Sequence, residues 1–125
     1  MNFKPIIIVV GEPYSVFSEL IFRLFKKKFF KKNKNKIIFV GSAKLLKLQM
    51  KKLKYKYKIN VLEKNFFDIK KLNKKSINII NVNFKFKKVF EKISNKSTHY
   101  INESFDVALD LIKKKHSNCL INGPI

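Results

Sequence analysis

Several residue types that mark particular classes of protein are scarce in this chain of 125 residues. It has one cysteine, Cys119, so an internal disulfide is excluded and we expect a protein of the reducing cytoplasm. Because Cys119 stands in an apolar segment, we expect it to be a small buried residue of the core. No stretch approaches the 18 apolar residues that suggest a membrane-spanning helix, and the apolar run near the N-terminus is too short for a signal peptide.

Glycine-rich loops and clusters of metal ligands are lacking as well. The chain has three glycines, and neither the dinucleotide-binding fingerprint nor the P-loop pattern is present. The two histidines, His99 and His116, stand far apart without histidine or cysteine partners at the spacing of a metal site. Glu103, Asp106 and Asp110 have helical spacing, and we interpret them as a solvated helix face rather than a metal site.

Basic residues, in contrast, are abundant. The chain has 29 Lys and Arg against 8 Asp and Glu, which gives a formal net charge of +21. A small lysine-rich nucleic-acid-binding protein is therefore an alternative function that stays open. Arg23 is the only arginine, however, and the chain is rich in Lys, Asn, Ile and Phe, which AT-rich codons encode. Because proteins that read phosphates and base edges use arginine heavily, we attribute most of the charge to coding bias and expect no specific nucleic-acid binding.

The apolar residues follow patterns typical of β-strands in an α/β protein. Three short runs are apolar at consecutive positions, as expected of adjacent strands that are buried on both faces: residues 6–10, 37–40 and 119–122. Residues 55–61 and 77–86 alternate between apolar and polar positions, which predicts half-exposed strands. The phase of the second stretch flips between Ile79 and Ile80, which suggests a bulge or a bend there.

Helical patterns occupy the segments between these strands, over residues 15–28, 42–53 and 98–115. Ser15 and Ser42 are suitable N-caps for the first two helices. The third helix has a predicted buried stripe made of Ile101, Phe105, Ala108, Leu109 and Ile112. The order of elements predicts that residues 1–125 form a single α/β domain, with an open, largely parallel sheet and helices on both faces.

Two segments allow a second interpretation. Residues 54–58 interleave tyrosine with lysine, as single-strand binders do, but we favour an edge strand with its lysines toward solvent. The helix at 15–28 carries phenylalanines beside basic residues and could lie on an anionic membrane. Because this helix follows a buried strand, we expect it to pack on the sheet and expect no membrane partner.

A candidate binding edge follows from the loops after the first and last strands. Ligands of open α/β sheets bind at the carboxyl ends of the strands. Glu12 and Asn122 each follow a buried run, and each is held by a neighbouring glycine and proline. We therefore expect these two residues to lie at the same edge of the sheet. Whether Glu12 is a functional carboxylate or a turn residue near a helix N-terminus stays open.

The whole chain resembles the N-terminal part of the 4-hydroxythreonine-4-phosphate dehydrogenase family. Four segments carry the resemblance, in the same order as in the family: Gly11-Glu12-Pro13 with Ser18-Glu19, Ile38 to Leu46, Tyr100 to Leu109, and Asn122-Gly123-Pro124-Ile125. The family usually continues its Gly-Glu-Pro with further glycines, where this chain has Tyr14 to Phe17. Threonine often precedes the later Gly-Pro, where this chain has Asn122.

The resemblance implies an isocitrate/isopropylmalate dehydrogenase-like fold, of which this chain is the N-terminal part, truncated after the Gly-Pro loop. It implies a cytoplasmic oxidoreductase of pyridoxal phosphate biosynthesis, which oxidises and decarboxylates 4-phosphohydroxy-L-threonine with NAD or NADP and a divalent metal. The family places this chemistry in a cleft of a homodimer. Its metal and substrate ligands lie beyond the Gly-Pro loop, so we expect no catalytic or metal-binding residue in this chain and no activity of the chain alone. The candidate cleft-edge residues are Gly11, Glu12, Pro13, Asn122, Gly123 and Pro124.

Overall fold

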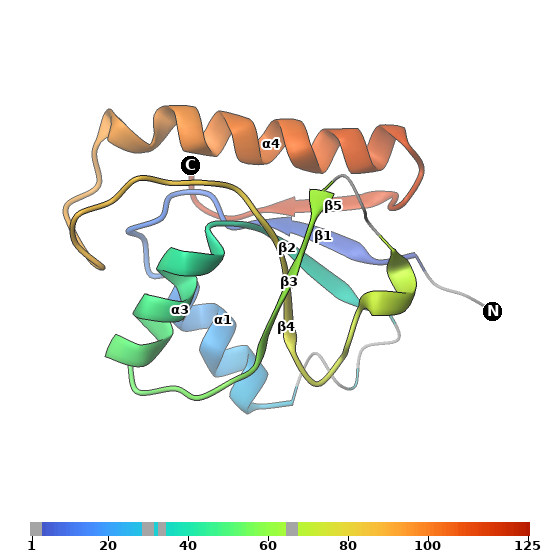
Figure 1. Cartoon of the computed structure of the whole chain (residues 1–125), viewed down its shortest axis with the longest axis horizontal. Coiled ribbons are helices and arrows are strands. Elements are labelled where there is room, and N and C mark those ends of the chain that lie inside the picture. The colour runs from blue at the N-terminus through green and yellow to red at the C-terminus, as the bar shows by residue number, and fades with distance from the viewer. Residues whose placement is uncertain (1–3, 29–31, 33–34, 65–67) are drawn as a thin grey trace.

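The computed structural model describes residues 4–28, 32, 35–64 and 68–125, which form a parallel sheet with helices on both of its faces (Figure 1). The sheet has five strands in the order β3-β4-β2-β1-β5. The strands are β1 (Ile6–Val9), β2 (Ile37–Gly41), β3 (Ile59–Leu62), β4 (Ile77–Asn81) and β5 (Cys119–Asn122). The helices are α1 (Phe17–Lys26), α3 (Ala43–Lys52) and α4 (Thr98–Lys113), with short 3-10 helices η2 (Ile69–Lys71) and η3 (Asn95–Ser97).

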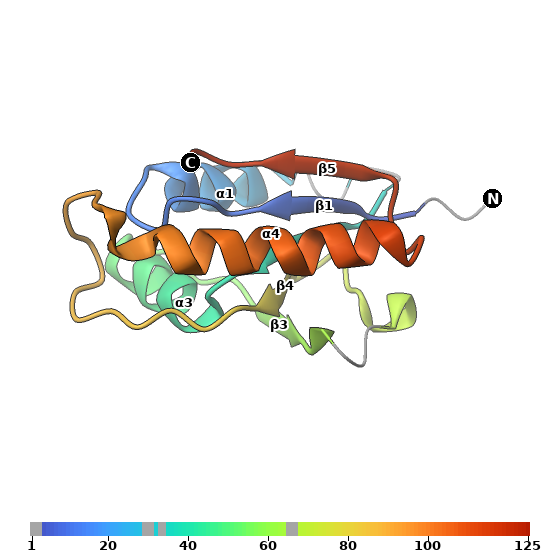
Figure 2. The ribbon, with the colours of Figure 1, turned by 90° about the horizontal axis from the view of Figure 1, so that it is seen from above.

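The predicted neighbourhood of the three apolar runs is confirmed. β1 pairs in parallel with β2 on one side and with β5 on the other, so that Val9 lies between Val40 and Asn122. α1 and α3 pack on one face of the sheet, and α4 packs on the opposite face (Figure 2). An α/β fold with a parallel sheet between helices is thus what the described residues form.

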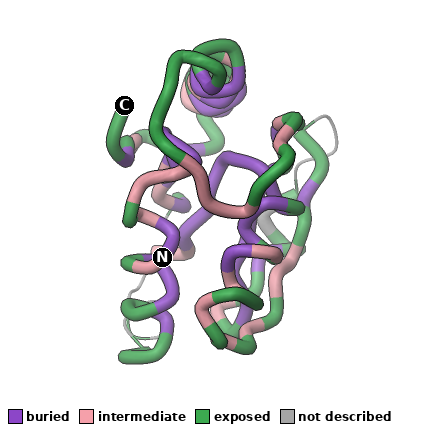
Figure 3. Tube along the Cα trace, turned by 90° about the vertical axis from the view of Figure 1, so that its left-hand side faces the viewer, coloured by how far each residue is buried: buried purple, intermediate pink, exposed green. Residues whose placement is uncertain are grey.

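The central strands and the inner sides of the helices make two cores, one on each face of the sheet (Figure 3). Ile21, Phe22 and Phe25 of α1 are buried, which confirms that this helix packs on the sheet. α1 begins at Phe17 with Val16 at the N-cap position, so the prediction that Ser15 caps this helix is wrong. The Ser15 hydroxyl lies one residue earlier and accepts a hydrogen bond from the Phe17 N–H at 3.2 Å. No helix in the described part of the chain is long and apolar enough to cross a membrane.

Two predictions about burial at the C-terminal side are wrong. Cys119 is exposed, although we expected it in the core, and Ile121 has 48% of its surface exposed. The reason is that β5 is an edge strand, so only one neighbouring strand, β1, lies beside its apolar residues. In α4, the predicted stripe is confirmed in part: Ile101 and Ala108 are buried, and Phe105 and Ile112 are partly buried against the core. Leu109 is 55% exposed, because the buried side of the helix turns toward Tyr100, Ser104, Val107 and Leu111.

The alternating stretch at 77–86 also folds differently from the prediction. β4 lies inside the sheet between β2 and β3, and its register with β2 runs evenly from Asn78 to Asn81, without the expected bulge. The apparent change of phase arises because both faces of β4 are covered, so apolar residues stand on both. The polar Asn78 is accommodated because its side chain hydrogen-bonds Asn60, Asn73 and Ile37.

The Tyr–Lys run at 54–58 precedes the edge strand β3 rather than forming it. Its aromatic rings pack against α1: Tyr55 lies 5.5 Å from Phe22, and Tyr57 lies 5.0 Å from Phe25, measured between ring centroids. The lysines of this run are exposed. The tyrosines are half-buried and form part of the packing beside α1.

Candidate functional site

The loops that follow β1 and β5 meet at the carboxyl edge of the sheet. The Gly123 N–H donates to the Val9 carbonyl at 2.7 Å, and the Glu12 N–H donates to the Pro124 carbonyl at 2.6 Å. These bonds continue the pairing of β1 with β5 beyond the strands. The expectation that Glu12 and Asn122 share one edge is therefore confirmed, whereas the role of this edge in a cleft stays a prediction.

Two glycines allow these loops to approach so closely. Gly11 has a φ of +79°, and a Cβ atom there would collide with the Pro124 carbonyl oxygen. A Cβ atom on Gly123 would collide with the carbonyl oxygen of Val10. Because any side chain would push the two loops apart, glycine is required at both positions.

Glu12 is buried and has hydrogen-bond partners inside the protein. The residue is 5% exposed, and its Oε2 accepts a hydrogen bond from the Ser97 hydroxyl at 2.8 Å. Its Oε1 accepts a longer bond from the Tyr14 N–H at 3.3 Å. Glu12 thus joins the β1 loop to the start of α4, which favours a structural role for its carboxylate. Ser97 lies 85 positions from Glu12, and no local pattern pointed to this partner.

The N-terminus of α3 lies at the same edge, and side chains of this protein satisfy its backbone donors. The Ser42 N–H donates to the Tyr100 hydroxyl at 2.8 Å, and the Ala43 N–H donates to Asn81 Oδ1 at 3.0 Å. Ser42 is the predicted N-cap, and its hydroxyl accepts from the Leu45 N–H at 3.2 Å. These donors are consequently not available to a phosphate group.

Tyr100 is the most strongly perturbed titratable group at this edge. Burial raises the pKa of Tyr100 to about 12, although the hydrogen bonds with Ser42 and Ser104 act in the opposite direction. The nearby carboxylate of Glu12 adds a smaller upward shift of this pKa. Tyr100 is therefore neutral at physiological pH and serves as a hydrogen-bond acceptor for α3.

A pocket of about 310 Å³ opens beside these loops, over the segment that leads from β4 to α4. The chain leaves β2 toward one face of the sheet and leaves β4 toward the other, and such a switch point is where open α/β sheets bind ligands. The pocket is lined by Tyr14, Phe84, Lys85, Phe86, Lys87, Lys88, Glu91 and Lys96. Sequence reasoning missed this pocket because it assigned residues 82–86 to a strand. The alternation of phenylalanine and lysine there was the available signal.

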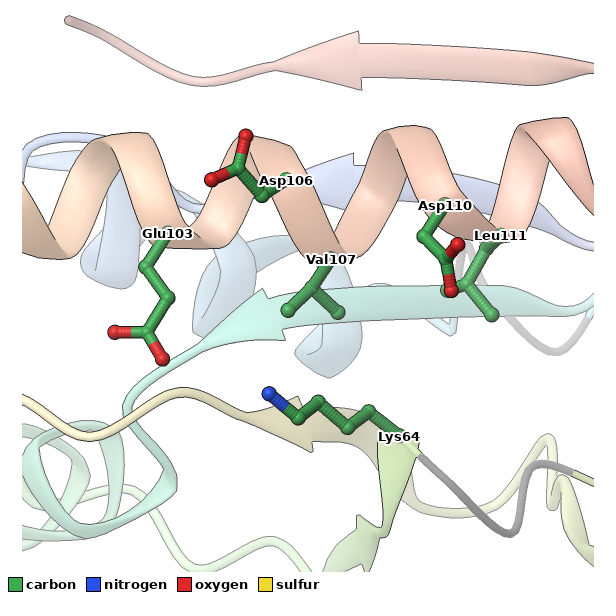
Figure 4. Close-up of a pocket in the computed structure, with 6 residues that line it drawn as sticks. All are labelled: Lys64, Glu103, Asp106, Val107, Asp110 and Leu111. Carbon is green, nitrogen blue, oxygen red and sulfur yellow. The ribbon is translucent and has the colours of Figure 1, made fainter.

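A second pocket, of about 440 Å³, lies between α4 and the end of β3 (Figure 4). Glu103 and Asp110 of α4 extend toward Lys64, whereas the Asp106 carboxylate turns away from it. Within the described ranges no group of three or more His, Cys, Asp or Glu residues could hold a metal ion. His99 is 94% exposed and lies 3.9 Å from Glu103, at the opposite end of α4 from His116. These residues do not fit the divalent metal of the dehydrogenase family.

Comparisons with known proteins show similarity in structure only. No protein-family model matches the sequence, and no curated protein matches it. A 4-hydroxythreonine-4-phosphate dehydrogenase from Burkholderia phymatum matches 99% of this chain with a TM-score of 0.81 and 14% identity. A candidate 4-hydroxythreonine-4-phosphate dehydrogenase from Salmonella typhimurium matches 97% of it with a TM-score of 0.75 and 15% identity. This chain covers 37% of the length of either structure, so its fold is the fold of one part of these dehydrogenases, consistent with an N-terminal portion.

Proposed function

We propose that this chain is the N-terminal portion of an enzyme resembling 4-hydroxythreonine-4-phosphate dehydrogenase, and that it supplies sheet scaffold and cleft-edge loops. The observation that carries the proposal is the agreement in fold over 99% of the chain, at a TM-score of 0.81. The sequence segments that resemble the family, which occur in the family's order, support the proposal independently. Two of them, the Gly-Glu-Pro and Asn-Gly-Pro loops, meet at one edge of the sheet.

The substrate of such an enzyme would be a small phosphorylated hydroxy-amino acid, and the reaction would be an NAD- or NADP-dependent oxidation followed by decarboxylation. A divalent metal would polarise the reacting oxygen atoms as a Lewis acid, with ligands supplied by the rest of the enzyme. The contribution of this chain would be positional. Gly11 and Gly123 fix the spacing of the two loops, and Asn122 carries an exposed amide at the rim.

The proposal includes the assembly and the setting that the resemblance implies, a homodimer of the complete enzyme in the cytoplasm. The alternative, a lysine-rich nucleic-acid-binding protein, has less support. Tyr55 and Tyr57, the aromatic residues of the candidate single-strand segment, pack against α1. The remaining argument for nucleic acid is the net charge of +21, which is not specific for any ligand.

The test begins with the reading frame. We expect the coding DNA to continue past Ile125. As the resemblance to the dehydrogenase family implies, it should encode a lysine after the Gly-Pro loop, then a Gly-His-Thr-like segment and spaced histidines. The protein from the extended frame should reduce NAD or NADP with 4-phosphohydroxy-L-threonine, and EDTA should abolish this activity. The 125-residue chain should give no reduced cofactor above background. A stop codon directly after Ile125, or metal-dependent turnover by the short chain, would contradict the proposal.

A pair of variants in the extended enzyme tests the role of the loop edge. Asn122→Ala removes the exposed amide at the carboxyl end of β5, whereas Asn118→Ala removes an exposed amide just before its amino end. We expect Asn122→Ala to change KM or kcat and Asn118→Ala to leave both unchanged. Equal kinetics for the two variants would mean that the Asn-Gly-Pro loop does not border the cleft.

A further inference from the structure

The pocket over the β4–α4 connection is lined by aromatic rings that other parts of the protein hold in place. Phe84 lies 4.7 Å from the buried Tyr100 and 5.9 Å from Tyr14, between ring centroids. Phe86 is stacked on Phe84 with its ring tilted by 24° at 6.2 Å. The Tyr14 hydroxyl also donates to the Lys88 carbonyl at 3.3 Å, which ties the rim to the β1 loop. The rings are therefore positioned before any ligand enters.

The charge around these rings is predominantly positive. Four lysines line the pocket, against one carboxylate from Glu91, which lies 3.8 Å from Lys96. A fifth ammonium group, Lys44 Nζ, is 5.9 Å from the centroid of the Phe86 ring. Phe86 as a whole is half-buried, so part of the residue stays accessible beside Phe84 and Lys44, the two neighbours of its ring. An anion with a planar group could therefore contact the positive lysines and the aromatic ring in the same pocket.

The size of the pocket suits a small molecule better than a polymer. Its volume of about 310 Å³ is at the lower end of the range of about 300–1,000 Å³ that is usual for small-molecule sites. A single-stranded nucleic acid would require successive stacking platforms along a groove. Here the rings are gathered in one pocket at the switch point of the sheet.

We propose that this aromatic–lysine pocket, made by Tyr14, Phe84, Phe86 and the surrounding lysines, binds a small phosphorylated compound with a planar ring, of the size of a nucleoside monophosphate. The planar ring stacks on Phe86, and the lysine ammonium groups neutralise the phosphate. The proposal concerns binding at this pocket, and it does not depend on the proposed dehydrogenase activity. Binding can therefore be tested without any measurement of turnover.

Isothermal titration calorimetry of the chain at physiological ionic strength tests the proposal with AMP, adenosine and inorganic phosphate as probes. We expect AMP to bind one to one, and at least about tenfold more tightly than adenosine or phosphate, since each of these lacks one half of the ligand. Phe86→Leu should weaken AMP binding by at least about fivefold, the equivalent of the smallest stacking contribution measured per base. Circular dichroism verifies that this variant is folded.

A charge-matched pair of double variants separates the pocket from the general charge. Lys87→Gln with Lys88→Gln should weaken AMP binding several-fold. Lys51→Gln with Lys52→Gln removes the same charge from the far end of α3 and should leave binding unchanged. In the unmodified chain, nuclear Overhauser effects between the adenine protons and the Phe86 ring should place the ligand, whatever the stability of the variants.

Three results would overturn the proposal. AMP that binds no more tightly than phosphate would mean that the rings make no contribution. Equal losses in the two double variants would mean that the net charge alone attracts the anion. A twelve-residue oligothymidine that binds more tightly than AMP, and loses affinity in Phe86→Leu, would identify the surface as a single-strand interface instead.

Discussion

Replacement of Tyr100 by phenylalanine tests the junction between β2, α3 and α4. The Tyr100 hydroxyl accepts the hydrogen bond of the Ser42 N–H at 2.8 Å, and the residue is 4% exposed. Tyr100→Phe keeps the ring, with its contact to Phe84, but leaves a buried N–H without an acceptor. We expect the free energy of unfolding to fall by about 1–3 kcal/mol at pH 7, the usual cost of such an orphaned donor.

The difference in the free energy of unfolding between the unmodified protein and Tyr100→Phe should become smaller at high pH. The pKa of Tyr100 is raised from 10.0 to about 12 in the folded protein. Above pH 10 the unfolded chain releases the phenolic proton while the folded chain retains it, so folding is opposed as the pH rises from 10 to 12. At pH 11 this linkage should cost the unmodified protein about 1.4 kcal/mol, and Tyr100→Phe should not experience it.

Urea denaturation followed by circular dichroism at pH 7, 9 and 11 measures this effect. The gap in stability between the two proteins should be constant from pH 7 to 9 and should then narrow by about 1.4 kcal/mol at pH 11. The pKa values of Tyr14 and Tyr57 are also raised, chiefly by burial, but both residues are present in both proteins and their contributions cancel. A gap that stays constant up to pH 11 would refute the buried, hydrogen-bonded placement of Tyr100.

Four further outcomes follow from the structure. Gly11→Ala should lower the free energy of unfolding by at least about 2 kcal/mol in chemical denaturation, because its positive φ disfavours a side chain and its Cβ would displace Pro124; an unchanged stability would contradict the close approach of the loops. Glu12→Gln should cost about 1 kcal/mol in the same assay by weakening the charge-assisted bond from Ser97. The apolar surface at the β5 edge, where Ile121 is exposed, should make the chain self-associate, and Ile121→Lys should reduce this self-association in sedimentation velocity. Binding to duplex DNA should be weak, should fall steeply with salt in fluorescence anisotropy, and should show no preference among sequences.

Local sequence patterns predicted the features that depend on neighbouring residues. The apolar runs identified β1, β2 and β5, and Ser42 was found as the cap of α3. The shared edge of Glu12 and Asn122 followed from the parallel direction of β1 and β5. These inferences required only the periodicity of the chain and the geometry of parallel sheets.

The features that sequence reasoning missed depend on partners far away in the chain. An apolar run shows that a strand can be buried, but not that a neighbour covers it, and so Cys119 and Ile121 of the edge strand were placed in the core. The bond from Ser97 to Glu12 spans 85 positions and has no local signature. The interior position of β4 depends on the order of the strands, and alternation alone wrongly indicated a half-exposed strand.

The placement of the glycines indicates what the chain contributes at the candidate edge. Gly11, Gly41 and Gly123, the three glycines of the chain, all lie at the carboxyl ends of strands. Each stands where a Cβ atom would strike another segment, which for Gly41 is the Tyr100 hydroxyl at 2.8 Å. The edge is therefore specified by close backbone packing rather than by reactive side chains.

The polar groups of this edge are used in the same way. The Glu12 carboxylate is engaged by Ser97, and the backbone donors at the start of α3 are engaged by Tyr100 and Asn81. The lysines around Phe86, in contrast, are exposed at the mouth of the neighbouring pocket. If the chain binds an anion at this side of the sheet, its affinity must then depend on those lysines and not on the loops.

The Lys87/Lys88 double variant and the Glu12→Gln variant should consequently have different effects. The first should lose affinity for AMP at unchanged stability, and the second should lose stability at unchanged affinity. If instead Glu12→Gln lost affinity for AMP and the Lys87/Lys88 double variant did not, the anion would bind at the Gly-Glu-Pro loop.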